Sequence, residues 1–141
     1  MITKKISPLT DIKFSTILEV RINNINYGNH LGHDSLISLL HEARVKFLRG
    51  MGFTELDLDG LALIMTHLAV NYIKEAFYGD SLTINIGIEE VSKISVQLNY
   101  QVKNTVSNIE IARALTTMTF YDYHNKKIAR VPKLFLEKVS V

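Results

Sequence analysis

Several kinds of residue and segment are missing from this chain of 141 residues. There is no cysteine, which excludes thiol catalysis, disulfides and cysteine metal sites. No run reaches the ~18 apolar residues of a membrane-spanning helix, and residues 1–10 lack the apolar core of a secretion signal. These absences together predict a cytoplasmic protein without a membrane span.

The chain also lacks a large excess of positive or negative charge. The formal net charge is +2, which is too weak a bias to predict binding to nucleic acid. Hydrophobic residues make up 47% of the chain and charged residues 21%, as is typical of globular proteins. Because repeats and low-complexity tracts are absent as well, we expect a single domain over residues 1–141.

One long helix is predicted, from His33 or Asp34 to about Arg49. Gly50 and Gly52 supply the stop, because glycine adopts a left-handed C-terminal cap at little cost. Steps of 100° per residue place a set of apolar side chains on one broad stripe. That stripe consists of Leu36, Leu39, Leu40, Ala43 and Phe47.

Most of the remaining chain alternates apolar and polar residues, which indicates β-strands. Short turns connect these segments, so we expect an antiparallel meander. One helix then needs a sheet that curls around it to cover its stripe, which predicts an α+β fold. The expected strands are residues 12–20, 61–65, 68–74, 82–89, 94–102, 109–121 and, as a last edge strand, Lys133–Val139.

Three landmarks carry a family resemblance. They are VRINNINYGNHLGHDSLISLLHEAR at residues 20–44, the strand leading to Gly79-Asp80 within residues 70–82, and Arg130-Val131-Pro132. Together they resemble the hotdog-fold acyl-CoA thioesterases related to 4-hydroxybenzoyl-CoA thioesterase. The resemblance implies an antiparallel sheet wrapped around one long central helix. It also implies a homodimer or homotetramer that hydrolyses an acyl-CoA, or an acyl carrier protein thioester, to free acid and thiol without a cofactor.

The chain departs from that family at its acids. The two aspartates that follow the family's arginine correspond to Asn24 and Asn26, whereas His30 falls on the family's histidine. Asparagine is no carboxylate and can only position a water or donate to an oxygen. Something else must therefore supply the base. Among the carboxylates, Asp34 is the first choice and Glu42 the second.

Thioester hydrolysis needs donors for the developing oxyanion and a base for the attacking water. Backbone N–H groups from Leu31 to Asp34, at the positive end of the helix dipole, are the expected donors. Gly32 would let the substrate approach the backbone closely. His30 is expected to act as a base or to orient water. The assignment is Asn24, His30, Asp34 and Glu42 as catalytic residues, and Asn29, Leu31, Gly32, His33, His41, His67 and Arg130 as substrate-binding residues.

Each assignment has a simpler structural alternative. An acid in the first helical turn, such as Asp34, is favoured by capping and the dipole alone. Glu42 can form a solvated pair with the lysine one turn later. His41 and His67 can be core or interface residues, and Arg130 can belong to a solvated rim instead of binding a substrate phosphate.

Two other functions remain open. One is a non-catalytic acyl-thioester binding or scaffold protein, and the other is a hydroxyacyl-thioester dehydratase. A metal site is not expected, because His30, His33 and Asp34 lack the i,i+4 spacing of common zinc motifs.

Overall fold

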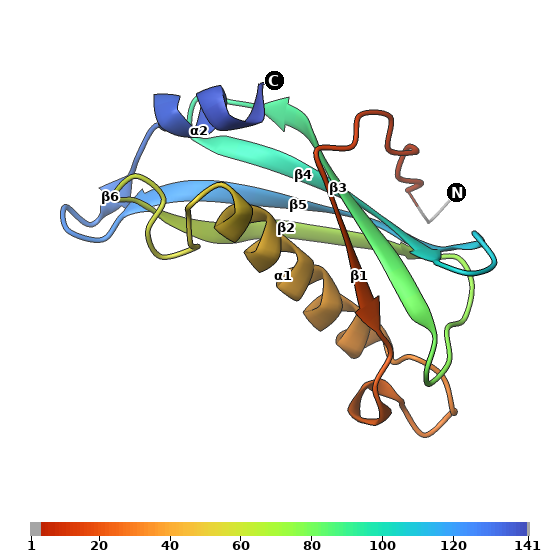
Figure 1. Cartoon of the computed structure of the whole chain (residues 1–141). Helices are drawn as coiled ribbons and strands as arrows, with labels where there is room; N and C mark the ends of the chain where they lie inside the picture. The colour runs from red at the N-terminus through yellow and green to blue at the C-terminus, as the bar shows by residue number, and fades with distance from the viewer. Residues whose placement is uncertain (1–3, 141) are drawn as a thin grey trace.

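The computed structural model describes residues 4–140, which form one long helix, one antiparallel sheet and a short C-terminal helix (Figure 1). The elements in chain order are β1 (Phe14–Glu19), a 3₁₀ turn (Ile22–Asn24), α1 (His33–Gly50), β2 (Ala62–Tyr72), β3 (Ser81–Val91), β4 (Ser95–Asn104), β5 (Glu110–Asp122), β6 (Lys127–Ile128) and α2 (Lys133–Val139).

The sheet has the order β1-β3-β4-β5-β2, with β6 beside β5. Strands β3, β4 and β5 form the predicted meander, and every pair is antiparallel. β1 and β2 form the two edges of this order. Figure 1 shows α1 lying across one face of the curved sheet. The predicted α+β architecture, a sheet wrapped around one helix, is therefore confirmed.

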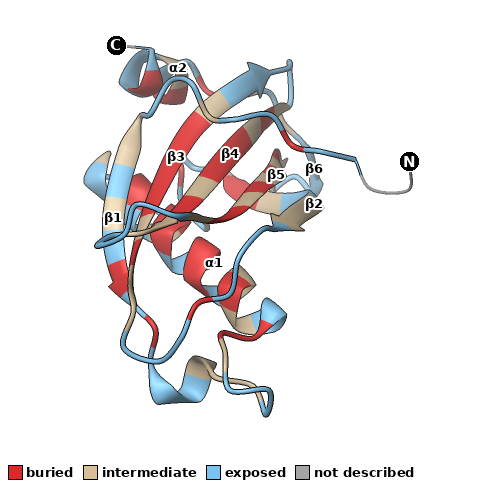
Figure 2. Cartoon of the chain, turned by 90° about the vertical axis from the view of Figure 1, so that its right-hand side faces the viewer, coloured by how far each residue is buried: buried red, intermediate tan, exposed pale blue. Residues whose placement is uncertain are grey.

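The core lies between α1 and the inner face of the sheet. Leu36, Leu40 and Ala43 of the predicted stripe are at most 2% exposed, and they share a core cluster with Ile84 and Ile86 of β3. Burial of each large aliphatic side chain contributes about 1.5–3 kcal/mol. Figure 2 shows the buried residues concentrated on α1 and the central strands. Packing against the sheet therefore fixes the orientation of α1 and of the loop that precedes it.

The segment Lys133–Val139 is a helix, so the prediction of a last edge strand is wrong. Its buried residues are Phe135 and Val139, which are one helical turn apart. The Phe135 ring packs against that of Phe120 at a centroid distance of 5.7 Å. Seven residues are too few to separate a period of 2 from one of 3.6, so the contact with the core decided the conformation.

Strand β2 joins two segments that the sequence pattern kept apart. The register of β2 against β5 shifts between Met65 and His67, which marks a β-bulge. One continuous strand therefore runs from Ala62 to Tyr72 and carries the chain to the start of α1.

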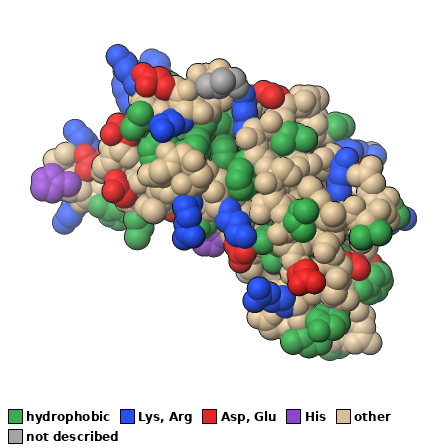
Figure 3. Space-filling view, in the orientation of Figure 1, with side chains coloured by type: hydrophobic (Ala, Val, Ile, Leu, Met, Phe, Trp, Pro, Cys, Tyr) green, Lys and Arg blue, Asp and Glu red, His purple; other side chains and the backbone are tan. Residues whose placement is uncertain are grey.

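The two charge signs are mixed on the surface. Figure 3 shows acidic and basic side chains interspersed over the face it draws, as a net charge of +2 leads one to expect. Neither helix within residues 4–140 combines the length and apolarity that a bilayer crossing requires.

The N-terminal segment crosses the outer face of the sheet, as Figure 2 shows. The Ile6 N–H donates to Asn71 Oδ1 at 2.6 Å, at the β2 edge. Further along, the segment passes directly over Gly87 of β3. A Cβ atom at Gly87 would lie 2.5 Å from both the Asp11 carbonyl oxygen and Leu9 Cδ1. Glycine at this position is therefore what allows the segment to lie against the sheet.

We expect Gly87→Ala to lower the free energy of unfolding by about 1–3 kcal/mol, because the added methyl group overpacks the crossing. Urea unfolding at equilibrium measures this. Gly50→Ala is the matched control, because a Cβ there meets nothing within 4 Å. The control should change stability by less than about 1 kcal/mol, and in the stabilising direction. Equal losses in the two variants would contradict the proposed crossing constraint.

Candidate active site

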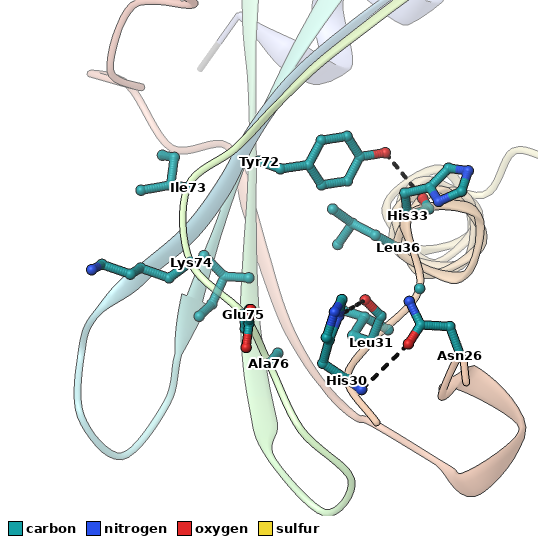
Figure 4. A pocket seen from close by; sticks show the side chains of 12 residues that line it. Asn26, His30, Leu31, His33, Leu36, Tyr72, Ile73, Lys74, Glu75 and Ala76 are labelled. Atoms are coloured by element: carbon teal, nitrogen blue, oxygen red, sulfur yellow. Dashed lines mark hydrogen bonds between the residues drawn. The ribbon is translucent and has the colours of Figure 1, made fainter. Parts of the chain in front are cut away.

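A pocket of about 300 Å³ lies where α1 begins, between the preceding loop and the segment that follows β2. We call it the helix-start pocket. Figure 4 shows Tyr72 pointing toward the start of α1 from the β2 side, with His30 and Asn26 on the opposite side and Lys74 extending away. Apolar side chains and one glycine complete the pocket. The lining residues are Asn26, His30, Leu31, Gly32, His33, Leu36, Tyr72, Ile73, Lys74, Glu75, Ala76 and Ile111.

The loop before α1 is held by its asparagines. Asn26 Oδ1 accepts the N–H of Gly28 at 2.9 Å and that of His30 at 3.4 Å. Asn24 Oδ1 accepts the Arg21 N–H at 2.7 Å. Such side-chain to backbone bonds are how asparagine stabilises tight turns. Both carboxamide oxygens at the family's aspartate positions therefore serve the shape of the loop.

The start of α1 presents free donors, but fewer than predicted. The Leu31 N–H donates to the Ala76 carbonyl at 2.8 Å, and the Gly32 N–H donates to the Asn24 carbonyl at 3.0 Å. These two groups are thus not available to a substrate. The N–H groups of His33 and Asp34 have no acceptor within residues 4–140, and the cap residue Gly32 has no side chain to satisfy them. They form the anion-binding end of the helix.

His30 has one defined tautomer in this geometry. Its Nδ1 lies 3.2 Å from the Leu31 carbonyl oxygen. A carbonyl can only accept, so Nδ1 carries a proton, and in the neutral ring the lone pair is on Nε2. His30, which lines the helix-start pocket, can therefore accept a proton at Nε2 when its ring is neutral.

Tyr72 ties the end of β2 to the first turn of α1. Its hydroxyl donates to the His33 carbonyl at 3.1 Å, as Figure 4 shows. Burial of the ring raises the pKa of Tyr72, and the nearby Asp34 carboxylate raises it further. The hydroxyl therefore remains a donor at neutral pH and holds the His33 peptide in place.

Two predicted catalytic residues lie elsewhere. Asn24 and Glu42 line a separate hollow of about 200 Å³, which shares no lining residue with the helix-start pocket. Glu42 is also 3.8 Å from Lys46, its i,i+4 partner. Asp34 is exposed and does not line the pocket, but its Oδ1 lies 2.7 Å from where a Cβ on Gly32 would be. Asp34 thus folds back over the helix start, next to the pocket.

The predicted substrate-binding residues divide between the pocket and other places. Leu31, Gly32 and His33 line the helix-start pocket. Asn29 is an exposed loop residue with φ of 67°, a conformation that asparagine tolerates. Other residues are placed outside the pocket: His41 on α1, His67 opposite Thr117 on β5, and Arg130 as an exposed residue after β6. Within residues 4–140, no group of three or more His, Asp or Glu residues could hold a metal.

His41 and Arg44 belong to a polar cluster beneath the sheet. Arg44 is 4% exposed; its Nε donates to Glu55 at 3.1 Å and its Nη1 donates to the Tyr100 hydroxyl at 3.2 Å. His41 Nε2 lies 2.6 Å from the other Glu55 oxygen. Burial alone would lower the pKa of Arg44, but the Tyr100 hydroxyl and then the Glu55 carboxylate raise it. The cluster thus keeps a buried charge satisfied and supports the middle of α1.

Sequence reasoning missed several residues of the pocket. Tyr72, Lys74 and Glu75 lie within the second family landmark, residues 70–82, but no role was assigned to their side chains. The one sign in the sequence that could have pointed to these residues was a short polar segment between two predicted strands. It could not show that this segment faces the helix start, because the contact depends on how β2 packs beside α1.

Comparison with known proteins agrees with this geometry. A sheet wrapped around one long helix is the hotdog fold. The chain belongs to the thioesterase-like superfamily, whose family model matches residues 20–139. A protein of Aquifex aeolicus named "Putative esterase" is 30% identical over 107 residues, which is 74% of this chain and 80% of the relative.

Solved structures show the same fold. The 1,4-dihydroxy-2-naphthoyl-CoA thioesterase from Synechocystis superposes with a TM-score of 0.82 at 19% identity, covering 90% of this chain and 95% of that one. A hypothetical protein from Aquifex aeolicus has a TM-score of 0.81 at 26% identity, covering 89% and 98%. The predictions of a hotdog fold and of a thioesterase are confirmed.

We expect Arg44→Ala to lower the free energy of unfolding by about 3 kcal/mol, because it leaves Glu55 and Tyr100 without their buried donor. His41→Ala, which removes a half-exposed partner of the same carboxylate, should cost less than about 1 kcal/mol. Equilibrium urea unfolding of both variants checks the difference. Similar small losses would show that Arg44 is not the centre of the cluster.

Proposed function

We propose that this thioesterase hydrolyses an acyl-CoA thioester in the helix-start pocket. The observation that carries the proposal is the pair of N–H groups on His33 and Asp34, which have no acceptor within residues 4–140. His33 lines the pocket together with His30, and Asp34 follows it in the first turn of α1. An acyl thioester places its carbonyl oxygen on these donors. Charge that develops on this oxygen is then stabilised by fixed dipoles, an effect typically worth about 10²–10³ in rate for one donor.

His30 supplies the base in this scheme. Its Nε2 takes a proton from water while the water oxygen attacks the carbonyl carbon. The tetrahedral intermediate collapses, the C–S bond breaks, and the imidazolium returns the proton to the thiolate of CoA. The step balances with water as the co-reactant: one oxygen and one hydrogen of water end in the acid, and the other hydrogen ends on the thiol.

The choice of CoA rests on the fold neighbour named as a 1,4-dihydroxy-2-naphthoyl-CoA thioesterase. Acyl carrier protein thioesters present the same pantetheine arm and are the second candidate. A non-catalytic scaffold or a dehydratase is disfavoured because the chain belongs to the thioesterase-like superfamily. A location in the cytoplasm stays a prediction.

A panel of acyl-CoAs assayed for free thiol tests the proposal. We expect His30→Gln to lower kcat by about 10²–10⁴, because the basic nitrogen is lost. His124→Gln is the matched control, since His124 lies in an exposed turn away from the pocket. Full activity of His30→Gln would exclude this base. A wild-type protein that releases no thiol from any acyl-CoA or acyl carrier protein would exclude the function.

We also propose that two copies pair along β2 to form a homodimer. The outer edge of β2 has no strand partner within the described chain. Met65 and Tyr72 on this strand are 37% and 52% exposed, and Ile73 directly after it is 43% exposed. An unpaired edge strand with apolar side chains favours association with another strand.

We expect sedimentation velocity to show a dimer at micromolar concentration. Met65→Lys should shift the population toward monomer, because a lysine on an edge strand opposes pairing. The matched control is Ile17→Lys on the other edge strand, β1, where Ile17 is 58% exposed. A monomer at every concentration, or equal effects of both variants, would contradict pairing through β2.

A further inference from the structure

The helix-start pocket contains a carboxylate that does not come from the loop before α1. Among the residues that line it, Glu75 is the one acid. Glu75 makes no ion pair or hydrogen bond within residues 4–140. Its charge is therefore not neutralised by a structural partner and faces the same space as His30.

The backbone holds Glu75 beside His30. The hydrogen bond from the Leu31 N–H to the Ala76 carbonyl, at 2.8 Å, joins the residue after His30 to the residue after Glu75. Figure 4 shows the two side chains in the pocket, extending from different walls. This short cross-link makes His30 and Glu75 neighbours although they lie far apart in the sequence.

The segment that carries Glu75 is anchored at both ends. On one side, the N–H groups of Ile73 and Lys74 donate to the Ile111 carbonyl at 2.9 and 3.1 Å. On the other side, the Phe77 N–H donates to Asp80 Oδ2 at 2.9 Å. Glu75 is thus presented from a fixed backbone, as a group that assists catalysis must be.

We propose that Glu75 is the positioning carboxylate of this thioesterase and replaces the missing family acid by stabilising the His30 imidazolium. This inference rests on the proposed function. When water gives its proton to His30 Nε2, a positive charge forms on the ring, and the negative charge of Glu75 offsets it. Glu75 itself stays ionised, and the proton passes from His30 to the thiolate as the C–S bond breaks.

The other candidate acids are less well placed. Glu42 lies in the separate hollow beside Lys46. Asp34 and Glu75 are both exposed, but Glu75 lines the helix-start pocket and Asp34 does not. The remaining charged or titratable groups that line the pocket are Lys74, His33 and the Tyr72 hydroxyl, none of which supplies a negative charge at neutral pH. Among the lining residues, Glu75 is therefore the one that can supply a negative charge to the reaction.

The test compares Glu75→Gln, Glu75→Asp and Glu75→Ala with the wild-type enzyme, using the best acyl-CoA of the panel. We expect Glu75→Gln to lower kcat about 10- to 100-fold while KM changes by less than about 3-fold, because the charge assists the transition state more than binding. Glu75→Asp should restore part of kcat. Added formate should raise kcat of Glu75→Ala but not that of the wild type.

Glu137→Gln is the matched control, because Glu137 is an exposed acid on α2 outside the pocket. An active wild type together with an equally active Glu75→Gln overturns the role of Glu75 and leaves the proposed function intact. A loss confined to KM, or a loss that neither aspartate nor formate relieves, also overturns it. A wild type without thioesterase activity overturns both proposals.

Discussion

The hydrogen bond between the Leu31 N–H and the Ala76 carbonyl is the constraint on which the site depends. It fastens the loop before α1 to the segment after β2, and the pocket lies between these two pieces of chain. It occupies the Leu31 N–H, and the Gly32 N–H is bonded to the Asn24 carbonyl, so within residues 4–140 the donors without an acceptor begin at His33. It also brings the wall that carries Glu75 beside the wall that carries His30.

Asn24 and Asn26 keep the shape of the loop before α1 but carry no charge. A carboxamide oxygen accepts the same hydrogen bonds as a carboxylate oxygen, so Asn24 and Asn26 keep the tight turns of the loop. They bring no negative charge and no basic oxygen. The loop therefore keeps the shape of a thioesterase site, and the acid–base chemistry must come from other residues, such as His30.

The polar residues of α1 divide between chemistry and stability. The first turn is open to the pocket because Gly32 caps it without a side chain. Further along the helix, Arg44 is buried and held by Glu55 and Tyr100, which satisfies a charge within the core. A rigid middle keeps the open end in position, since α1 cannot rotate without breaking those bonds.

The sequence by itself determined the local elements of this protein. Periodicity located the helix, which runs from His33 to Gly50, and the alternating strands, because both depend on residues close together in the chain. It misjudged Lys133–Val139, where the segment was too short for its period to be read. Only the tertiary structure decided which side chains meet. Glu42 lies in a different hollow from His30, whereas Glu75 lines the same pocket. Which residues share a pocket depends on hydrogen bonds and packing between distant segments, which local sequence patterns do not encode.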